Sequence, residues 1–473
     1  MPARCADPTV GPVSVVDLAR LQFAGTSIYH FLFVPLTIGL GLLTAVLQTF
    51  WHRTDKPEYL RLTRFFGVLL VINVAVGVVT GLVQEFQFGM NWSGYSRFVG
   101  DVFGAPLAME GLAAFFLEST FLGLWVFGWN RLSRRVHLAT IWAVAAGGVL
   151  SAAFIMAANS WMQNPVGYEI NPVTQRAQLT SIGAVLANPV FLRSFLHVLL
   201  ASVITAAVVM LAVAAWHLRR RSHAAEFGRA ARIALGVLAP AVALNLLVGS
   251  ELGVTEGEFQ PMKIAAAEAQ WQTCQPCSFS LFQIGGGNDD QTPSKIIQVP
   301  HLLSLLATNS WNGQVVGLND LQAQYVQQYG PGDYVPNVFV QYWAMRGMAY
   351  LGSLLLVVAL WGLWRRNRLV ESPWFLRVAI WCLPLPFLVN TAGWILTENG
   401  RQPWIVQGLQ KTADANSPSV SAAAIVTSLL IFLLLYGALA VVDWVLMARY
   451  ARKELPAEEA ADEIEAPTPA PTY

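Results

Sequence analysis

The feature that most constrains this chain is a series of apolar stretches, each about as long as a bilayer is thick. An α-helix needs about 20 apolar residues to cross the hydrocarbon core, and only helices or closed barrels satisfy their own backbone hydrogen bonds there. The stretches cover residues 21–50, 66–84, 104–128, 138–157, 188–216, 231–250, 343–364, 375–397 and 421–447. They predict an all-α membrane protein of about nine transmembrane helices packed in bundles.

Composition agrees with a polytopic membrane protein. The 473 residues are 55% hydrophobic and 12% charged, whereas an ordinary soluble domain is about 25% charged. Net charge is +1 and basic residues are confined to short turns, so we expect a lipid bilayer as the surrounding medium and no nucleic-acid partner. The first stretch is not predicted to be a signal peptide, because Asp17 and Arg20 precede it and no small-residue cleavage site follows.

Basic residues predict the orientation. They cluster in the turns that follow the odd-numbered stretches, and such turns face the cytoplasm. These clusters are Arg53, Lys56, Arg61 and Arg64; Arg131, Arg134 and Arg135; Arg219, Arg220, Arg221, Arg229 and Arg232; Arg365, Arg366 and Arg368; and Arg449, Arg452 and Lys453. The N-terminus is therefore predicted outside and the C-terminus in the cytoplasm.

The stretches divide the chain into segments. Four helices are expected in residues 1–157, two in 188–250, two in 343–397 and one in 421–447. Between the sixth and seventh lies a long polar segment, 251–342, predicted on the outer side. The tail 454–473 is acidic and rich in Pro and Ala, which predicts disorder.

Two histidines, His30 and His197, lie inside apolar stretches. A histidine in hydrocarbon is costly and by default marks a functional site, although a carbonyl of a neighbouring helix can also satisfy it. The other five sit beside arginines at stretch ends or in the polar segment, where imidazole costs little: His52, His137, His217, His223 and His301.

Five side chains that can bind a metal are predicted at one depth. His30 and His197 each lie about nine residues inside their stretches, both entered from outside. On the same side Met348 opens the seventh stretch, Glu398 closes the eighth and Glu110 enters the third. Imidazole, thioether and carboxylate suit iron, and His with Met is an axial pair for low-spin haem. Met348 taken alone is more typical of a core-filling methionine.

Glu118 lies deeper than Glu110 on nearly the same helix face. Eight residues at 100° each place the two carboxylates about 80° apart, with the small Ala114 between them. Staggered carboxylates on one stripe predict steps of a proton route. The alternative is two independent glutamates that are hydrogen-bonded within the helix bundle.

Three residues at the end of the eighth stretch share one face. Trp394, Glu398 and Arg401 fall at i, i+4 and i+7. Arg401 is therefore placed either to neutralise Glu398 or to hold a haem propionate.

A series of different motifs follows in order along almost the whole chain. They are Arg20-Leu-Gln-Phe-Ala; Tyr29-His30-Phe-Leu-Phe-Val-Pro; Glu85-Phe-Gln-Phe-Gly with Asn91-Trp92; Gly104-Ala-Pro-Leu-Ala-Met-Glu110; Ala114-Phe-Phe-Leu-Glu118-Ser-Thr; Asn159-Ser-Trp-Met-Gln-Asn-Pro165; Lys263 with Glu268; and Gly400-Arg-Gln-Pro-Trp404. Together they resemble subunit I of the cytochrome bd-type quinol oxidases.

The resemblance implies three haems. His197 and Met348 match the axial pair of low-spin haem b558, with Arg346 close by. His30 and Glu398 match ligands of the high-spin haems b595 and d, without showing which residue holds which haem.

The resemblance also implies roles for four further residues. Glu110 matches a carboxylate at the high-spin site, and Glu118 one on the proton route. Lys263 and Glu268 match quinol-site residues of the outer segment called the Q-loop, although by structure alone they could be a surface pair.

The Q-loop, residues 251–342, lacks the long insertion of some family members, so a short Q-loop type is expected. It contains Cys274-Gln-Pro-Cys277, a spacing that could form a disulfide in an oxidising outer compartment. A zinc site is not expected, because only this one cysteine pair is present there.

The function implied is a quinol oxidase of the bacterial cytoplasmic membrane. Menaquinol or ubiquinol would be oxidised outside and O2 reduced to water with cytoplasmic protons, which generates a membrane potential without a pump. A second membrane subunit is the expected partner, and small single-helix subunits are further candidates. One alternative is a secondary transporter, which predicts broken helices and an inverted repeat. The other is a b-type haem anchor, which needs only the His197 and Met348 site.

Overall fold

The computed structural model describes residues 14–455, and within them nine helical spans are long and apolar enough to cross a membrane. These spans are Val15–Thr54, Pro57–Met90, Ser93–Phe127, Arg134–Gln163, Pro189–Arg219, Ala224–Phe259, Val338–Arg365, Pro373–Gly400 and Ala422–Ala451. The prediction of about nine transmembrane helices is confirmed. Most of the predicted disordered tail, 456–473, lies outside the described residues.

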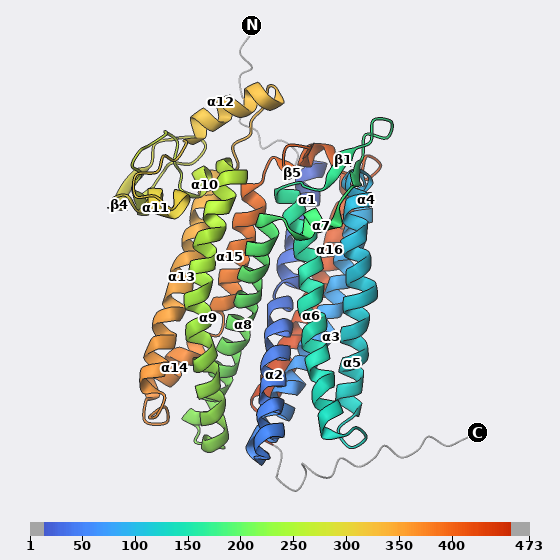
Figure 1. Cartoon of the computed structure of the whole chain (residues 1–473), viewed down its shortest axis with the longest axis vertical. Coiled ribbons are helices and arrows are strands. Elements are labelled where there is room, and N and C mark those ends of the chain that lie inside the picture. Colours follow the sequence, from blue (N-terminus) through green and yellow to red (C-terminus); the bar gives the residue numbers. More distant parts are fainter. Residues whose placement is uncertain (1–13, 456–473) are drawn as a thin grey trace, which may run out of the picture.

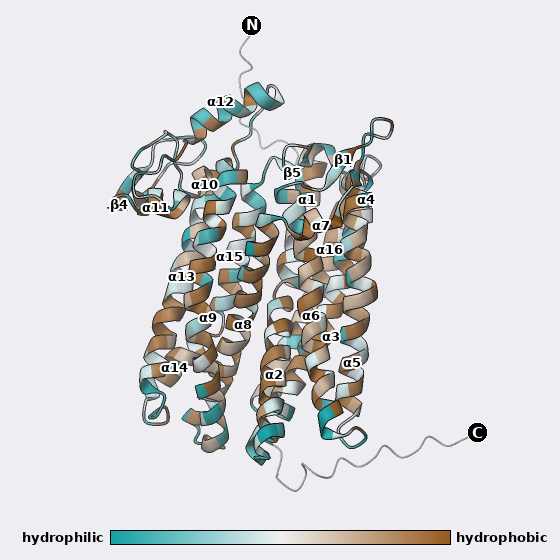
Figure 2. Cartoon of the chain, viewed as in Figure 1, coloured by the Kyte–Doolittle hydropathy of each residue, from teal (hydrophilic) through white to brown (hydrophobic). Residues whose placement is uncertain are grey.

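Most of the membrane-spanning helices are longer than the apolar stretches from which they were predicted. The third begins at Ser93 rather than 104, the fourth reaches Gln163 rather than 157, and the sixth reaches Phe259 rather than 250. A helix can continue into the polar interfacial layer, where charged and amide side chains are tolerated. Figure 2 shows this pattern as hydrophobic helix centres with hydrophilic ends.

Three spans are interrupted, which the sequence did not predict. The first is α1 (Val15–His30) followed by α2 (Val34–Thr54); the third is α4 (Ser93–Met109), the π-helix η1 (Glu110–Phe115) and α5 (Phe116–Phe127); the eighth is α14 (Pro373–Trp381) followed by α15 (Leu385–Gly400). At the first break the Asn73 Nδ2 donates to the Phe33 carbonyl oxygen at 2.9 Å, which also accepts from the Thr37 amide at 2.8 Å. Polar side chains of neighbouring helices commonly accompany irregular backbone at membrane depth.

The spans form two groups that meet at α2, α6 and α8 (Figure 1). The first group consists of α1 and α2, α3 (Pro57–Met90), α4-η1-α5, and α6 (Arg134–Gln163). The second consists of α8 (Pro189–Arg219), α9 (Ala224–Phe259), α13 (Val338–Arg365), and α14 with α15. We call them the first and second bundles. The last helix, α16 (Ala422–Ala451), packs on α3 and α1.

Glycine brings the two bundles together. A Cβ built at Gly39 of α2 would lie 2.2 Å from the Ser202 carbonyl oxygen of α8. Only a residue without a side chain permits this approach of two backbones, which is the usual role of small residues between membrane helices.

The two ends of the molecule differ. All the arginine-rich turns lie at one end, the arginine end, and the Q-loop lies at the other, the Q-loop end (Figure 1). The Q-loop end holds three antiparallel two-stranded sheets and several short helices. These are β1 (Tyr168–Ile170), β2 (Ala177–Leu179), α7 (Ile182–Leu186), α10 (Pro261–Ala267), β3 (Phe279–Ile284), β4 (Ser294–Val299), α11 (Leu302–Thr308), α12 (Leu318–Tyr329), β5 (Trp404–Val406), β6 (Gln410–Lys411) and the 3-10 helix η2 (Thr412–Asp414). Cys274 and Cys277 form a disulfide.

Candidate functional site

His30 is the last residue of α1, directly before the break in the first span. Its Nδ1 is 2.9 Å from the Thr80 hydroxyl on α3. The ring also packs against Gly81, where a Cβ would lie 3.1 Å from the imidazole Cε1. The contact to Nδ1 fixes the ring and leaves Nε2 as the nitrogen available to a ligand, as in other metal-binding histidines.

His197 and Met348 belong to the second bundle. His197 on α8 faces the main chain of α9, where a Cβ at Gly249 would lie 3.1 Å from the ring Cε1 and 3.4 Å from Nδ1. Met348 on α13 faces α15, where a Cβ at Gly393 would lie 3.2 Å from its Sδ. Both side chains therefore point into the same group of four helices.

Glu398 lies in the last turn of α15, where two elements contact it. Its Oε1 accepts a hydrogen bond from Asn159 of α6 at 3.0 Å, and its Oε2 is paired with Arg401. The Glu398 side chain is still 36% exposed, whereas that of Arg401 is 3% exposed. Nε and Nη1 of Arg401 have no hydrogen-bond partner among the described residues. The ion pair expected from the sequence is present, and two further arginine donors are left over.

Trp394 connects this region to His30. Its ring packs edge-on against Phe31, with 5.0 Å between centroids. Since Phe31 directly follows His30, the break in the first span lies beside α15.

Glu110 and Glu118 both face α6. Glu110 opens the π-helix and its Oε1 accepts a hydrogen bond from Ser151 at 2.7 Å. Glu118 packs on α6 one turn away, where a Cβ at Gly148 would lie 3.7 Å from its Oε1. The π-turn takes up one extra residue, which reduces the predicted angle of about 80° to roughly 20°. The two carboxylates therefore line one stripe, as predicted.

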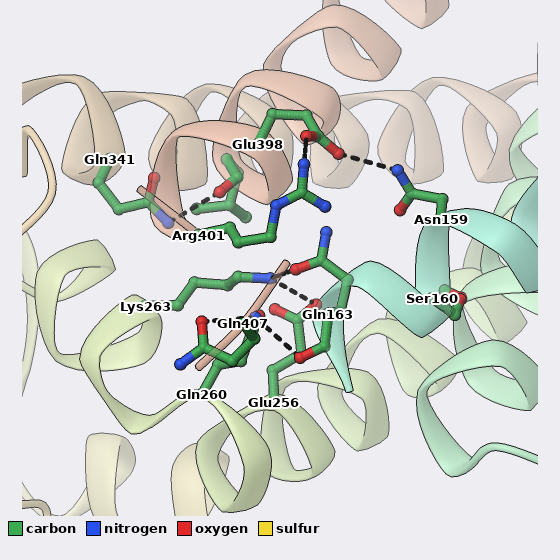
Figure 3. A network of polar contacts seen from close by, with 12 residues as sticks. Asn159, Ser160, Gln163, Glu256, Gln260, Lys263, Gln341, Glu398, Arg401 and Gln407 are labelled. Atoms are coloured by element: carbon green, nitrogen blue, oxygen red, sulfur yellow. Dashed lines mark hydrogen bonds and ion pairs between the residues drawn. The ribbon is translucent and has the colours of Figure 1, made fainter. Parts of the chain in front are cut away.

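Lys263 of α10 is almost fully buried, with 1% of its surface exposed. Its Nζ donates to Gln163 Oε1 at 2.9 Å and to Glu256 Oε1 at 3.1 Å (Figure 3). Burial lowers the pKa of the Lys263 amine, and the Glu256 carboxylate opposes this shift. Figure 3 also shows that Gln163 and Asn159 extend from the same end of α6, one toward Lys263 and the other toward Glu398.

Glu268 follows α10 and is held by α13 rather than by Lys263. Its Oε2 is 2.7 Å from Arg346 Nη2, and that guanidinium also donates to the carbonyl oxygens of Ala267 and Ser280 at 2.6 Å. Burial raises the pKa of Glu268, and Arg346 opposes this shift. The predicted quinol pair is thus two separate ion pairs, one at each end of α10.

A cavity of about 150 Å³ lies beside the second ion pair, between β3 and the start of α13. It is lined by residues that include Ala269, Phe282, Gln283, Tyr342 and Trp343. Tyr342 stacks under the Arg346 guanidinium, 3.9 Å from the ring centroid. A larger cavity of about 630 Å³, at α4 and the β1–β2 hairpin, contains none of the predicted site residues.

Two histidines correct the expectation that imidazole at stretch ends costs little. His137 is 2% exposed and His217 is 1% exposed, because the helices continue past the apolar stretches and bury their ends. The His137 ring nitrogens lie 2.8 Å from the Gln48 side chain and from the Trp125 carbonyl oxygen. His217 stacks on Phe227, 3.8 Å between centroids. Neither was identified from the sequence, and both are held by contacts inside the bundle.

Sequence reasoning also missed Glu256 and did not assign Asn159 or Gln163 a role. The last two lie in a motif that was noted, which was the available signal. Nothing in the sequence around Glu256 distinguishes it from its neighbour Glu258. Their difference appears only when α10 folds back on the end of α9.

Comparison with known proteins resolves the family. A family model for cytochrome bd terminal oxidase subunit I matches residues 18–455. The chain belongs to this family. It is 42% identical over 434 residues to cytochrome bd ubiquinol oxidase subunit 1 of Bacillus subtilis (strain 168), which covers 90% of this chain and 91% of the relative. It is 38% identical over 504 residues to cytochrome bd-II ubiquinol oxidase subunit 1 of Escherichia coli (strain K12), which covers 93% and 96%.

A solved bd oxidase structure from Geobacillus thermodenitrificans has the same fold as this cytochrome bd subunit I. The TM-score is 0.84 at 30% identity, covering 93% of this chain and 99% of the other. The resemblance and the fold class are confirmed, and membership makes this a haem-containing, multi-pass protein of respiratory electron transport. Broken helices were also expected of a transporter, so family membership, rather than the breaks, decides between the alternatives.

Proposed function

We propose that this chain is the haem-bearing subunit of a complex that oxidises quinol and reduces O2 to water. One observation supports haem binding beyond family membership: three candidate ligands each pack against a glycine of a neighbouring helix. The pairs are His30 with Gly81, His197 with Gly249, and Met348 with Gly393. A glycine beside a ligand removes the side chain that would occupy the space of a flat macrocycle. Among residues 14–455 no three His, Cys, Asp or Glu side chains converge on a bare ion, which suits single axial ligands.

In this proposal His197 and Met348 hold haem b558 within the second bundle. A histidine and a methionine that both ligate one iron make it low-spin, and such a haem accepts and passes single electrons. The α9 main chain orients the His197 ring so that Nε2 points away from α9. Arg346, two residues from Met348, ties this helix to the Q-loop through Glu268.

His30 and Glu398 would hold the two high-spin haems, b595 and d. Thr80 orients the His30 ring, and Asn159 orients the Glu398 carboxylate. The unpaired Nε and Nη1 of Arg401 suit a propionate, which prefers arginine. Trp394 links the two ligand regions by its contact with Phe31.

Protons for water would come along the α6 stripe from the arginine end. Glu118 lies deeper and passes a proton to Glu110, which Ser151 holds at the high-spin site. With the arginine end in the cytoplasm of a bacterial inner membrane, each proton crosses most of the membrane potential. This stores about 2.3 kcal/mol per 100 mV for each charge, without a pump element.

Quinol would be oxidised at the Q-loop end. The aromatic cavity beside Glu268 suits a quinone ring, because Phe282, Tyr342 and Trp343 offer ring faces and Glu268 offers a proton acceptor. Quinol becomes quinone by losing two electrons and two protons, and the protons leave on the outer side. Menaquinol and ubiquinol both fit this chemistry.

A second membrane subunit would cover part of the surface that the helices otherwise expose to lipid. The α16 helix shows an apolar face that includes the exposed side chains of Leu433, Leu434, Val441 and Trp444. Small single-helix subunits are further candidates for such faces.

A reduced-minus-oxidised spectrum of the purified complex tests the proposal, together with quinol-driven oxygen uptake. We expect b-type bands plus a chlorin band, and oxygen consumption that depends on quinol. One b-type band without oxygen uptake would indicate an electron-transfer anchor instead. A protein without haem bands would overturn the proposal.

A further inference from the structure

Glu256 occupies an unfavourable place for a carboxylate. It lies in the last turn of α9, where the helix macrodipole is negative and favours cations. The residue is also 9% exposed, so water solvates the charge poorly. A buried carboxylate at a helix C-terminus needs a compensating partner.

That partner is Lys263, seven residues later on α10. The Glu256 Oε1 to Lys263 Nζ distance is 3.1 Å, and the ammonium also donates to the neutral Gln163 amide oxygen at 2.9 Å. Gly400 closes the site from α15, where a Cβ would lie 2.4 Å from Lys263 Cγ. The lysine side chain is therefore held in one position, and Glu256 is the carboxylate that neutralises it there (Figure 3).

Other charges face Lys263 from α15. They are Arg401, which disfavours the ammonium, and Glu398, which favours it. These two are paired with each other, so their effects on Lys263 largely cancel. Glu256 is left as the counter-charge.

We propose that Glu256 is a positioning residue of the quinol site, which keeps Lys263 in its charged form and aimed at Gln163. This inference rests on the proposed role of Lys263 in quinol oxidation. Nothing in the family resemblance assigns Glu256 a role.

The consequence is a pH dependence with a definite sign. Burial lowers the pKa of Lys263 and Glu256 raises it again. Without the carboxylate the pKa falls, so the ammonium is lost at a lower pH. Because turnover needs the charged lysine, the alkaline limb of quinol turnover moves toward neutral pH. An opposite charge at this separation shifts a pKa by about 1 to 3 units.

The test uses Glu256→Gln in the intact complex, with quinol-driven oxygen uptake measured from about pH 6 to 9.5 and haem content measured on the same preparation. We expect unchanged haem content and an alkaline limb displaced downward by at least about one pH unit. The control is Glu258→Gln, an exposed glutamate on the same helix, which should reproduce the wild-type profile.

A second variant separates charge from folding. Lys263→Arg combined with Glu256→Gln restores a cation that stays protonated at every pH in the assay, so the displaced limb should return toward or beyond its wild-type position. A Glu256→Gln profile that superimposes on wild type, or is scaled equally at all pH values, overturns the inference. An equal displacement in the double variant also overturns it. A wild-type complex without quinol oxidase activity would instead overturn the proposed function.

Discussion

The two bundles differ in the regularity of the helices that carry their candidate ligands. In the second bundle, α8, α9 and α13 are continuous and His197 and Met348 project from unbroken helices, whereas the fourth span of this bundle is divided into α14 and α15, and α15 carries Glu398. In the first bundle, one span breaks directly after His30 and another becomes a π-helix at Glu110. Unbroken helices suit a haem whose two axial side chains stay bound throughout. Irregular turns instead re-aim side chains and free backbone groups, which suits a site where O2 and protons enter and water leaves. We therefore expect electron entry to depend on the continuous helices α8 and α13, and oxygen and proton chemistry to depend on the first bundle together with Glu398 of α15.

The largest effect is expected from Met348→Leu. Leucine fills the volume but cannot ligate iron, so the low-spin b signal should disappear or become high-spin, with quinol turnover lowered about 100-fold or more. The signals of the high-spin haems assigned to His30 and Glu398 should remain. The measurement is the reduced-minus-oxidised spectrum of the purified variant.

Met345→Leu is the matched control, because it removes a methionine one turn earlier on the same helix, about 60° away around the helix axis. An unchanged low-spin spectrum in the Met348 variant would show that Met348 fills space in the bundle and does not ligate the low-spin haem.

Glu118→Gln should impair only the proton supply that the first bundle is proposed to provide. The amide keeps the shape but cannot release a proton, so oxygen uptake should fall about 100-fold while haem content stays intact. Glu110→Gln should also disturb the high-spin haem signals, because that carboxylate lies at the ligand level. Oxygen uptake and haem stoichiometry measured on the same preparation check both variants.

Glu118→Asp keeps a titratable group and should recover most of the activity. Near-normal uptake in Glu118→Gln would show that the proton route does not pass through Glu118, and the partner subunit would be tested next.

Glu268→Gln and Lys263→Leu should slow electron entry by roughly 10- to 100-fold. Oxygen reaction of enzyme that has been chemically pre-reduced should be unaffected, because both residues lie at the Q-loop end. Stopped-flow reduction by quinol, compared with reoxidation by O2, separates the two steps. Loss of haem together with a normal quinol KM would show that the two ion pairs are structural.

The smallest and sharpest test exchanges single glycines. Gly249→Ala would place a Cβ 3.1 Å from the His197 ring, and Gly81→Ala would do the same at His30. Overpacking of this kind costs about 1–3 kcal/mol. We expect the first variant to perturb only the low-spin band and the second only the high-spin bands. Gly253→Ala and Gly89→Ala, where a Cβ meets nothing within 4 Å, are the controls.

The spans were predictable because bilayer thickness fixes the length of each apolar stretch. The interruptions were not. Phe31, Leu32 and Phe33 are as apolar as their neighbours, and only the nearby Pro35 signals a change, which also suits the start of a helix. The π-turn at Glu110 lies between Pro106 and Gly111, which both weaken an α-helix but do not specify a π-turn. Proline does not decide the other case either, because Pro384 and Pro386 accompany the break in the eighth span whereas α9 continues through Pro240.

Of the candidate site, the ionisable residues inside apolar stretches could be found from the sequence, because each is costly there. Their partners could not. Lys263 and Glu268 read as a pair at i and i+5, yet each is bound to a different helix, Glu256 on α9 and Arg346 on α13. Partner choice depends on how α10 packs between those helices, which no local spacing encodes.

The contact between Gly39 and Ser202 has a consequence for electron movement. Tunnelling between redox centres slows steeply as their separation grows, and the haems proposed at His197 with Met348 and at His30 lie in different bundles. Where α2 touches α8 backbone to backbone, no side chain remains to be compressed or to change rotamer. In the proposed function, this backbone contact limits how far the two bundles, and with them these haems, can move apart.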